Sequence, residues 1–365
     1  MKQFNDVYRG KKVFITGHTG FKGSWLSLWL TQLGAEVVGY SIGIPTNPSH
    51  FELLKLPVKT VTDDILHPEK LLEAIQTYRP DIVFHLAAQP IVRDSYLNPV
   101  DTFETNIMGT VNVLESCRLA GTVKAIVNIT SDKSYRNNEW ERGYVEDDAM
   151  GGYDPYSASK GAADIVANAY RSSFFNPERY GQEHLTLLAV ARAGNVIGGG
   201  DWAKDRLVPD MVRAASDQRT VIIRSPKAIR PWQHVLEPLS GYLQLGWRLL
   251  EGKKEIADNW NFGPTENSNR SVRQVLDSAR SYWNDIRYDI QEDPMNVHEA
   301  KFLTLNSTKA HQQLHWQSIW DGEITFKKTI EWYKNFYTHQ TVTSDQDLAS
   351  YLEDAQRAKV EWITT

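Results

Sequence analysis

The chain has 365 residues, of which 41% are hydrophobic, and a formal net charge of −5. This length exceeds one average domain, and no Pro- or Ser-rich linker divides it, so we expect two lobes that share a continuous core. The slight acidic excess argues against a nucleic-acid partner, because phosphate binding requires clustered Lys and Arg. No apolar signal core begins the chain, and no stretch approaches the roughly 20 apolar residues of a membrane span. We therefore expect a cytoplasmic protein without a membrane partner.

The single cysteine, Cys117, excludes an internal disulfide. It lies in an apolar pattern typical of a helix, so packing explains it better than reactivity does. The ten histidines show no paired spacing on one helical face, and we expect no metal site.

Short apolar runs typical of strands recur along the first half of the chain, with helical patterns between them. These runs are Val13–Thr16, Glu36–Tyr40, Ile82–Leu86, Ala125–Thr130 and Leu185–Ala191. The alternation indicates right-handed βαβ units, so we predict an α/β fold with a Rossmann-type, doubly wound parallel sheet. Ligands of such sheets bind beyond the carboxyl ends of the strands, where the polar clusters of this sequence fall.

The regularity weakens after Asn195, where glycines and prolines indicate loops and short elements. We therefore predict a smaller, mixed α/β C-terminal lobe for the substrate. In this division, residues 1–190 and about 228–250 form the dinucleotide-binding domain, and residues 191–227 and 251–365 form the nucleotide-sugar-binding lobe.

The C-terminal segment contains two helical patterns. Apolar residues at helical spacing predict a helix over Phe326–Phe336, and a capping-box pattern at Ser344 predicts a second helix over about 344–362. Leu348, Tyr351, Leu352 and Ala355 form one stripe on the second helix, which can pack on the body or on a partner.

The glycine-rich loop Thr16–Gly23 lies between a predicted strand and a predicted helix. Its glycines let backbone amides approach a pyrophosphate, and the helix N-terminus favours the negative charge. The acid that normally grips the adenosine ribose after the second strand is absent, because Gly39–Gly43 occupies that place. The preference for NAD over NADP is therefore open, and Lys22 is placed to accept a 2′-phosphate. Asp63 and Asp64 are either adenine contacts or residues that cap a helix.

Tyr156 and Lys160 are four residues apart, so they share one face of a helix. A lysine cation and an oxidised nicotinamide beside a phenol favour its phenolate, which makes a usable base near neutrality. Together with the hydroxyl of Ser131, this pair predicts redox chemistry on a sugar hydroxyl.

Asp132 and Lys133 follow Ser131 directly, and their presence distinguishes between two possible reactions. An epimerase that oxidises and re-reduces one carbon needs no additional acid and base, whereas an elimination does. The alternative is a surface ion pair in a polar loop. Arg206, Arg230 and His234 are candidates for the diphosphate of a second nucleotide, and solvated surface residues are the alternative.

Nine strings together resemble the extended short-chain dehydrogenase/reductase family, specifically its nucleotide-sugar 4,6-dehydratases. They are TGHTGFKG at 16–23, HLAAQPIVRDSY at 85–96, TNIMGT at 105–110, NITSDKSY at 128–135, YSASK at 156–160, ARAGNVIGGGDW at 191–202, RPWQHV at 230–235, NFGP at 261–264 and HEAKFLTLNSTKA at 298–310. The resemblance covers nearly the whole chain and implies NAD as cofactor. It is greatest to the branch of this group that acts on CDP-linked glucose.

The resemblance also implies residue roles. Ser131 and Tyr156 are similar to the pair that bonds the sugar C4 hydroxyl, and Lys160 to the residue on the nicotinamide ribose. The implied cofactor-binding residues, besides Tyr156 and Lys160, are Gly17, His18, Gly20, Phe21, Lys22, Gly23, Asp64, Ile65, Leu86, Ala87 and Ala88. The implied substrate-binding residues are Gln89, Arg93, Asn195, Arg206, Leu207, Arg230 and His234.

The implied reaction is a dehydration of CDP-D-glucose to CDP-4-keto-6-deoxy-D-glucose. Many relatives have a glutamate at the position of Lys133, so here neutral Lys133 is the expected C5 base and Asp132 the acid for the C6 hydroxyl. A nucleotide-sugar 4-epimerase and a catalytically dead dinucleotide sensor are the alternative functions. The resemblance further implies a homodimer, formed through helices near Thr105–Leu119 and Ser159–Arg171, and a deoxysugar for a surface polysaccharide.

Overall fold

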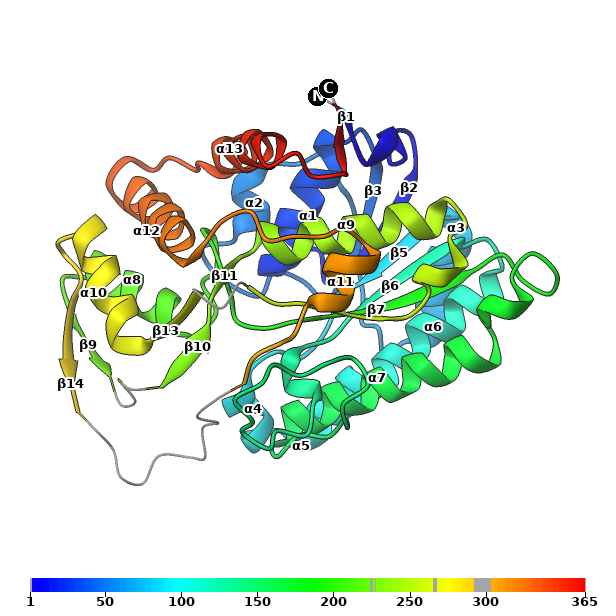
Figure 1. The fold of residues 1–365 in the computed structure, drawn as a ribbon, viewed down its shortest axis with the longest axis horizontal. Helices are drawn as coiled ribbons and strands as arrows, with labels where there is room; N and C mark the ends of the chain where they lie inside the picture. The colour runs from blue at the N-terminus through cyan, green and yellow to red at the C-terminus, as the bar shows by residue number, and fades with distance from the viewer. Residues whose placement is uncertain (1, 224–225, 227, 265–267, 292–302, 365) are drawn as a thin grey trace.

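The computed structural model describes residues 2–223, 226, 228–264, 268–291 and 303–364, with only the backbone of Ile229. Within these residues, seven strands form one parallel sheet (Figure 1). From edge to edge the strands are β12 (Asn259–Phe262), β7 (Leu187–Ala193), β6 (Ala125–Ile129), β5 (Ile82–His85), β2 (Lys12–Thr16), β3 (Glu36–Ser41) and β4 (Lys59–Thr62). All six neighbouring pairs run parallel. The predicted Rossmann-type sheet is confirmed.

Helices cover both faces of this sheet, as Figure 1 shows. One face packs against α1 (Phe21–Gln32), α9 (Leu236–Leu250) and α13 (Ser344–Arg357). The other face packs against α3 (Pro68–Tyr78), α6 (Gly109–Ala120) and α7 (Pro155–Ser173). Because the central strands are covered on both sides, their sequences are continuous apolar runs, which is why they were predictable.

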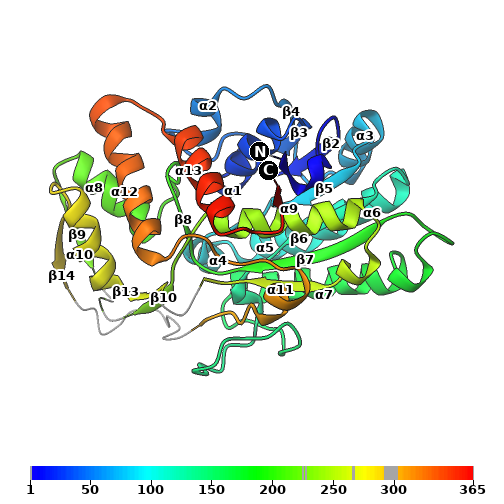
Figure 2. The ribbon, with the colours of Figure 1, turned by 45° about the horizontal axis from the view of Figure 1, so that its top comes forward.

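A second lobe with its own apolar core lies beside the sheet, on the left of Figures 1 and 2. The expectation that the two lobes share a continuous core is therefore wrong, because the buried residues form separate clusters. The second lobe contains α8 (Leu207–Ser216), α10 (Val272–Tyr282), α12 (Gly322–His339), the parallel pair β9 (Thr220–Ile223) and β14 (Arg287–Ile290), and the antiparallel pair β10 (Ile229–Pro231) and β13 (Asn269–Ser271). The predicted mixed α/β lobe is therefore present.

Short elements complete the described chain. They are β1 (Lys2–Gln3), η1 (Phe4–Asp6), α2 (His50–Leu54), α4 (Val92–Leu97), α5 (Pro99–Phe103), η2 (Glu104–Met108), η3 (Asp132–Ser134), η4 (Pro177–Arg179), β8 (Val196–Ile197), β11 (Gln233–His234), η5 (Lys254–Ile256), α11 (Thr308–Gln313) and β15 (Ile363–Thr364). Strand β1 pairs with β15, so the two ends of the described chain lie side by side (Figure 2).

Several boundaries differ from the sequence-based expectation. The exact division of the chain into two lobes stays a prediction, but the end of β7, β12 and α13 all lie with the large sheet, although their residues were assigned to the substrate lobe. Helix α13 ends at Arg357 rather than near 362. Residues 298–302 of the C-terminal string lie outside the described part.

The capping box expected at Ser344 is absent, because the N-cap of α13 is Thr343 and its side chain makes no capping hydrogen bond. The Ser344 hydroxyl instead contacts His50 Nε2 at 2.8 Å and accepts a hydrogen bond from Trp332 Nε1 at 2.9 Å. The stripe of α13 packs on the body of the protein, where Leu348 and Tyr351 are fully buried.

Candidate active site

A large crevice runs along the carboxyl ends of the parallel strands and continues into the second lobe. Residues that directly follow successive strands line it: Gly17 after β2, Ile42 after β3, Asp63 after β4, Leu86 after β5, Thr130 after β6 and Gly194 after β7. Its volume of about 2120 Å³ is roughly twice the upper size of about 1,000 Å³ that is typical of a site for one small molecule. The crevice therefore has room for two nucleotide ligands.

The glycine loop forms one end of this crevice and fits a dinucleotide. Gly17 has φ +75°, and a Cβ there would lie 2.8 Å from the backbone nitrogen of Ala87. A Cβ on Gly23 would lie 2.2 Å from the carbonyl oxygen of Gly17. Only glycine fits at these two positions. The absence of side chains there lets the loop run close to the N-terminus of α1, which stabilises an anion.

The adenosine side of the crevice lacks the usual ribose-binding acid. Ser41, Ile42 and Gly43 line the crevice after β3, and the side chain of Ile42 is 75% exposed. The carboxylates of Asp63 and Asp64 shape the turn before α3, since Asp63 accepts from His67 Nδ1 at 2.6 Å and Asp64 accepts from the Leu66 amide at 2.9 Å. Both residues also line the crevice, so their structural role is compatible with a contact to adenine.

Tyr156 and Lys160 lie together on the first turns of α7. Asp154 caps this helix by accepting from the Ser157 amide at 2.9 Å, and Pro155 occupies its first turn. Burial raises the pKa of Tyr156 to about 12, and the hydrogen bond with Ser131 offsets part of this rise. Burial lowers the pKa of Lys160 to about 8. The protein alone therefore does not lower the pKa of Tyr156 enough to give the phenolate that was expected near neutrality.

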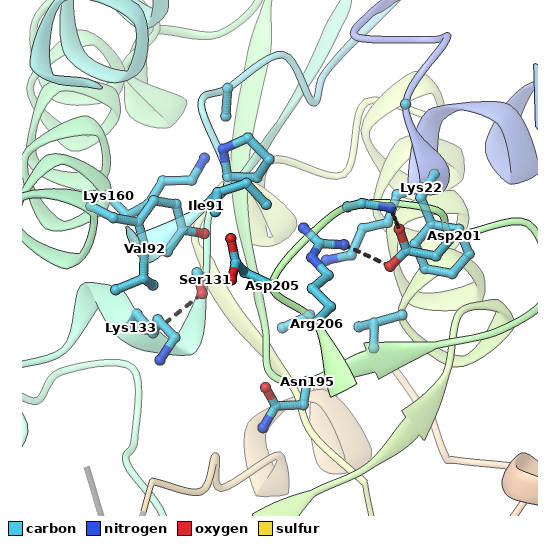
Figure 3. Close-up of a pocket in the computed structure, with 18 of the residues that line it drawn as sticks. Lys22, Ile91, Val92, Ser131, Lys133, Lys160, Asn195, Asp201, Asp205 and Arg206 are labelled. Atoms are coloured by element: carbon cyan, nitrogen blue, oxygen red, sulfur yellow. Dashed lines mark hydrogen bonds and ion pairs between the residues drawn. The ribbon is translucent and has the colours of Figure 1, made fainter. Parts of the chain in front are cut away.

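Ser131, Asp132 and Lys133 form a tight turn after β6, and Figure 3 shows Ser131 and Lys133 in the pocket. The Ser131 hydroxyl donates to Asp132 Oδ1 at 2.8 Å, and the Lys133 amide donates to Ser131 Oγ at 3.3 Å. Asp132 is buried whereas Lys133 is partly exposed. A buried carboxylate bonded to Ser131 does not match a surface ion pair, and the turn places a carboxyl group and an amine in the same crevice as Tyr156.

Two arginines lie where the crevice passes into the second lobe. Arg93 Nη1 contacts Asp205 Oδ1 at 2.6 Å, which joins α4 of the large domain to the loop before α8. Arg206 Nη1 contacts Asp201 Oδ2 at 2.8 Å, as Figure 3 shows. Burial, together with the positive charge of Arg206, lowers the pKa of Lys22 to about 8. This part of the crevice is therefore rich in cationic groups that suit phosphates.

Most of the expected ligand residues line the crevice. These are Gly17, Gly20, Phe21, Lys22, Gly23, Asp64, Ile65, Leu86, Ala87, Ala88, Arg93, Ser131, Asp132, Lys133, Tyr156, Lys160, Asn195, Arg206, Leu207 and Arg230. Three expected residues, His18, Gln89 and His234, do not line it.

The side chains of His18 and Gln89 have structural partners instead. The His18 ring bridges Ser41 Oγ at 2.9 Å and Thr60 Oγ1 at 3.0 Å, and its burial lowers its pKa to about 4. Gln89 Nε2 donates to Thr102 Oγ1 at 2.9 Å, which ties the loop after β5 to α5. These contacts turn both side chains away from the crevice.

His234 is fully buried and does not reach the diphosphate region. Its ring packs between Trp25 and Trp320, with ring centroids 5.9 and 4.8 Å away. Burial lowers its pKa to about 3, so the ring is neutral and offers no cation for a phosphate. The position of His234 therefore does not support its assignment to the substrate, which stays a prediction.

Sequence reasoning missed a buried ion pair behind the reaction centre. Arg192 and Asp164 are 1% and 0% exposed, and two hydrogen bonds of 2.8 and 2.7 Å join them. Asp164 also accepts from Thr130 Oγ1 at 2.9 Å, and Arg192 donates to Tyr135 Oη at 2.6 Å. The pair therefore links α7 to the residues beside Ser131. The sequence signal for this pair was Arg192, a charged residue within the otherwise apolar strand Leu187–Ala193.

Two features are absent from the described residues. No group of three or more His, Cys, Asp or Glu side chains is arranged to hold a metal ion. In the same part of the chain, no helix has the length and hydropathy needed to cross a membrane.

The fold, the glycine loop and the Tyr156–Lys160 pair together define a short-chain dehydrogenase/reductase. A family model described as GDP-mannose 4,6-dehydratase matches residues 14–331, and the chain belongs to this family.

Comparison with known proteins agrees with this assignment. The chain is 48% identical to the CDP-glucose 4,6-dehydratase of Salmonella typhimurium, over 96% of this chain and 99% of that protein. Among solved structures, it is similar to the epimerase Mth375 of Methanothermobacter thermautotrophicus, with a TM-score of 0.77, 22% identity, and coverage of 92% of this chain and 95% of that chain. It is also similar to the dTDP-glucose 4,6-dehydratase of Bacillus anthracis in complex with NAD, with a TM-score of 0.72, 20% identity, and coverage of 91% and 98%.

Proposed function

We propose that this protein is a lyase that converts CDP-D-glucose to CDP-4-keto-6-deoxy-D-glucose with NAD as its cofactor. The observation that carries the proposal is the clustering of Ser131, Asp132 and Lys133 with Tyr156 in one crevice. This arrangement supplies one set of groups for oxidation at C4 and a second set for elimination across C5 and C6. The 48% identity to the Salmonella enzyme supports the choice of substrate.

The cofactor fits the end of the crevice formed by the glycine loop. The amides around Gly17 and Gly23 hold the pyrophosphate, and Lys160 is positioned for the nicotinamide ribose. When bound, NAD supplies the hydride acceptor for C4 and the hydride donor for C6.

The oxidation begins at Tyr156, which removes the proton of the C4 hydroxyl as the hydride leaves C4. The positive charge of Arg206 and the hydrogen bond with Ser131 both favour the phenolate that this step requires. Ser131 bonds the substrate oxygen and orients it toward the phenol. The product of this step is a 4-ketone, which acidifies the hydrogen at C5.

The elimination uses the second set of groups. Lys133 is the base that removes the C5 proton, and Asp132 is the acid that protonates the departing C6 hydroxyl, so that one water is lost. After the hydride returns to C6, a proton is delivered to C5 from Lys133. Because the ammonium of Lys133 is partly exposed, this proton exchanges with solvent. At the end of the cycle, solvent takes the proton held by Tyr156 and returns one to Asp132.

A nucleotide-sugar 4-epimerase is the alternative, and the structural likeness to an epimerase shows that this fold supports both. The buried Asp132 beside Ser131 favours the dehydratase, because C4 epimerisation needs no acid for a leaving hydroxyl. A catalytically dead sensor is disfavoured, because it would have no reason to keep the full set of proton-transfer groups.

Incubation of the purified protein with CDP-, UDP-, dTDP- and GDP-glucose, with added NAD or NADP, tests the proposal. Mass spectrometry should show that CDP-glucose loses one water, and that this reaction proceeds when NAD is the added cofactor. Conversion to an isomer of unchanged mass would identify an epimerase. Tight dinucleotide binding without any product would favour the sensor.

We also propose that the protein is a cytoplasmic homodimer that contributes to a deoxysugar for a surface polysaccharide such as an O-antigen. Exposed apolar side chains on α5 to α7 support the dimer, including Val100, Leu119 and Ile165. A two-fold interface would bury this face of one copy against the same face of another. Sedimentation equilibrium of wild-type and Ile165→Asp protein tests it, since the charge should shift the dimer toward monomer.

A further inference from the structure

The crevice has a region that the cofactor and the reacting sugar do not fill. The glycine loop fixes the cofactor at one end, and Ser131 with Tyr156 fixes the sugar near the middle. The nucleotide of the substrate must therefore extend away from the cofactor. The remaining lining comes from the second lobe, chiefly α8, β9 and β10.

Phosphate-binding and base-binding surfaces can be separated in this region. Arg206 and Asn195 line the crevice, as Figure 3 shows. Arg230 lines the same crevice, and two guanidinium groups suit the diphosphate. The second lobe also contributes aliphatic side chains to the lining, including Leu207 on α8 and Ile223 on β9. Aliphatic surfaces of this kind pack against the faces of a planar base.

Asp210 is an acidic residue of the same lining. It is three residues after Leu207 on α8, so the two side chains share one face of the helix, and both line the crevice. Arg213 contacts Oδ1 of Asp210, and its other hydrogen bonds to the carbonyl oxygens of Trp202 and Ala203 hold it in place. The carboxylate is thus fixed in position, and its Oδ2 can accept a hydrogen bond from a ligand.

The other acids of this region are committed elsewhere. Asp201 uses both carboxylate oxygens, one for Arg206 and one for the Ala203 amide at 3.0 Å. Asp205 is paired with Arg93 across the crevice. Asp205 also lies in the loop before α8, so Asp210 is the acid that shares a helix face with Leu207.

We propose that Asp210 accepts a hydrogen bond from the 4-amino group of cytosine and thereby selects CDP-linked sugars over UDP- and dTDP-linked ones. This inference rests on the proposed function, because it assigns the base selection of the same site. Cytosine has a donor at position 4, whereas uracil and thymine have an acceptor oxygen there. A carboxylate opposite that position pairs with cytosine and repels the other two bases.

The test compares kcat/KM for CDP-glucose and UDP-glucose in wild-type protein, Asp210→Asn and the control Asp217→Asn. The control removes a carboxylate from the C-cap of the same helix, where Asp217 pairs with Arg219 away from the crevice lining. Asp210→Asn should reduce the preference for CDP-glucose roughly 10- to 100-fold, mainly through KM, because the base contact is equal in the ground and transition states. Asp217→Asn should keep the wild-type preference.

Binding of free CDP and UDP by calorimetry, with the cofactor present, provides the second measurement and does not depend on turnover. The ratio of the two affinities should fall in Asp210→Asn and persist in Asp217→Asn. A wild-type enzyme that prefers UDP-glucose would overturn the proposed substrate. A wild-type preference for CDP-glucose that Asp210→Asn fully retains in both assays would overturn only the role of Asp210.

Discussion

Arg192 on β7 and Asp164 on α7 form a two-bonded ion pair in the interior, with side chains 1% and 0% exposed. Removing the guanidinium leaves an uncompensated buried carboxylate, so Arg192→Met should lower the free energy of unfolding by roughly 3–5 kcal/mol. Urea denaturation measures this. The double variant Arg192→Met/Asp164→Leu should be less destabilised than Arg192→Met alone, because no charge remains buried.

A surface pair provides the matched control for that experiment. Arg118 makes two hydrogen bonds to Glu115, but both side chains are more than one-third exposed. Arg118→Met should therefore change the free energy of unfolding by less than about 1 kcal/mol. Similar small effects for Arg192→Met and Arg118→Met would show that the buried pair does not stabilise the fold.

Tyr156→Phe and Ser131→Ala test the first half of the reaction. Both variants should slow oxidation at C4 by roughly 10²–10⁴-fold, because each loses a group that moves or orients the hydroxyl proton. The rate is measured by nicotinamide absorbance in a single turnover. Tyr170→Phe is the control on the same helix, since the Tyr170 hydroxyl contacts Glu115 away from the crevice lining, and it should react at the wild-type rate.

Lys133→Met tests the elimination separately. The variant should oxidise C4 but fail to exchange the C5 hydrogen in heavy water, because Met cannot accept a proton. Absorbance reports the oxidation, and mass spectrometry reports the deuterium. Normal dehydration by Lys133→Met would remove Lys133 from the mechanism.

Glu237 on α9 gives a prediction for pH-dependent stability. Burial raises its pKa from 4.5 to about 7, although the Trp320 and Ile319 amides donate to its carboxylate. Between pH 4.5 and 7 the folded state binds more protons than the unfolded state, so this contribution falls as pH rises through that window, by roughly 3 kcal/mol in total.

The variant Glu237→Gln cannot lose a proton at this position. It should therefore lack this contribution to the change of the free energy of unfolding with pH. Denaturant titrations at several pH values between 4 and 8 compare it with wild-type protein. Asp347, whose burial raises its pKa to about 6, acts in the same direction in both proteins, so the difference between them isolates Glu237. Equal slopes would contradict the assigned pKa of Glu237.

The central strands could be predicted from the sequence because burial on both faces makes them continuous apolar runs. β4 and β12 were absent from the set of predicted strand runs for a physical reason. β4 is the edge strand Lys59–Thr62, with largely exposed side chains, and β12 combines two asparagines with aromatic residues. Neither has the uninterrupted aliphatic pattern of β6.

That the candidate catalytic residues line one crevice was predictable because they are close in sequence, within Ser131–Lys133 and Tyr156–Lys160. The burial of His234 was not predictable because its neighbours Trp25 and Trp320 are far away in the chain, and no local pattern shows which way its ring points. The raised pKa of Tyr156 was missed for a related reason, since burial by distant segments is not visible in a short motif.

The central claim is that one hydrogen moves from C4 to C6 of the same sugar during dehydration. CDP-glucose with deuterium at C4 tests this most directly, with the product analysed by NMR. The account predicts that the deuterium appears in the C6 methyl group of a 4-keto product. Deuterium that stays at C4, in a galacto isomer or in unchanged substrate, would contradict the dehydratase assignment.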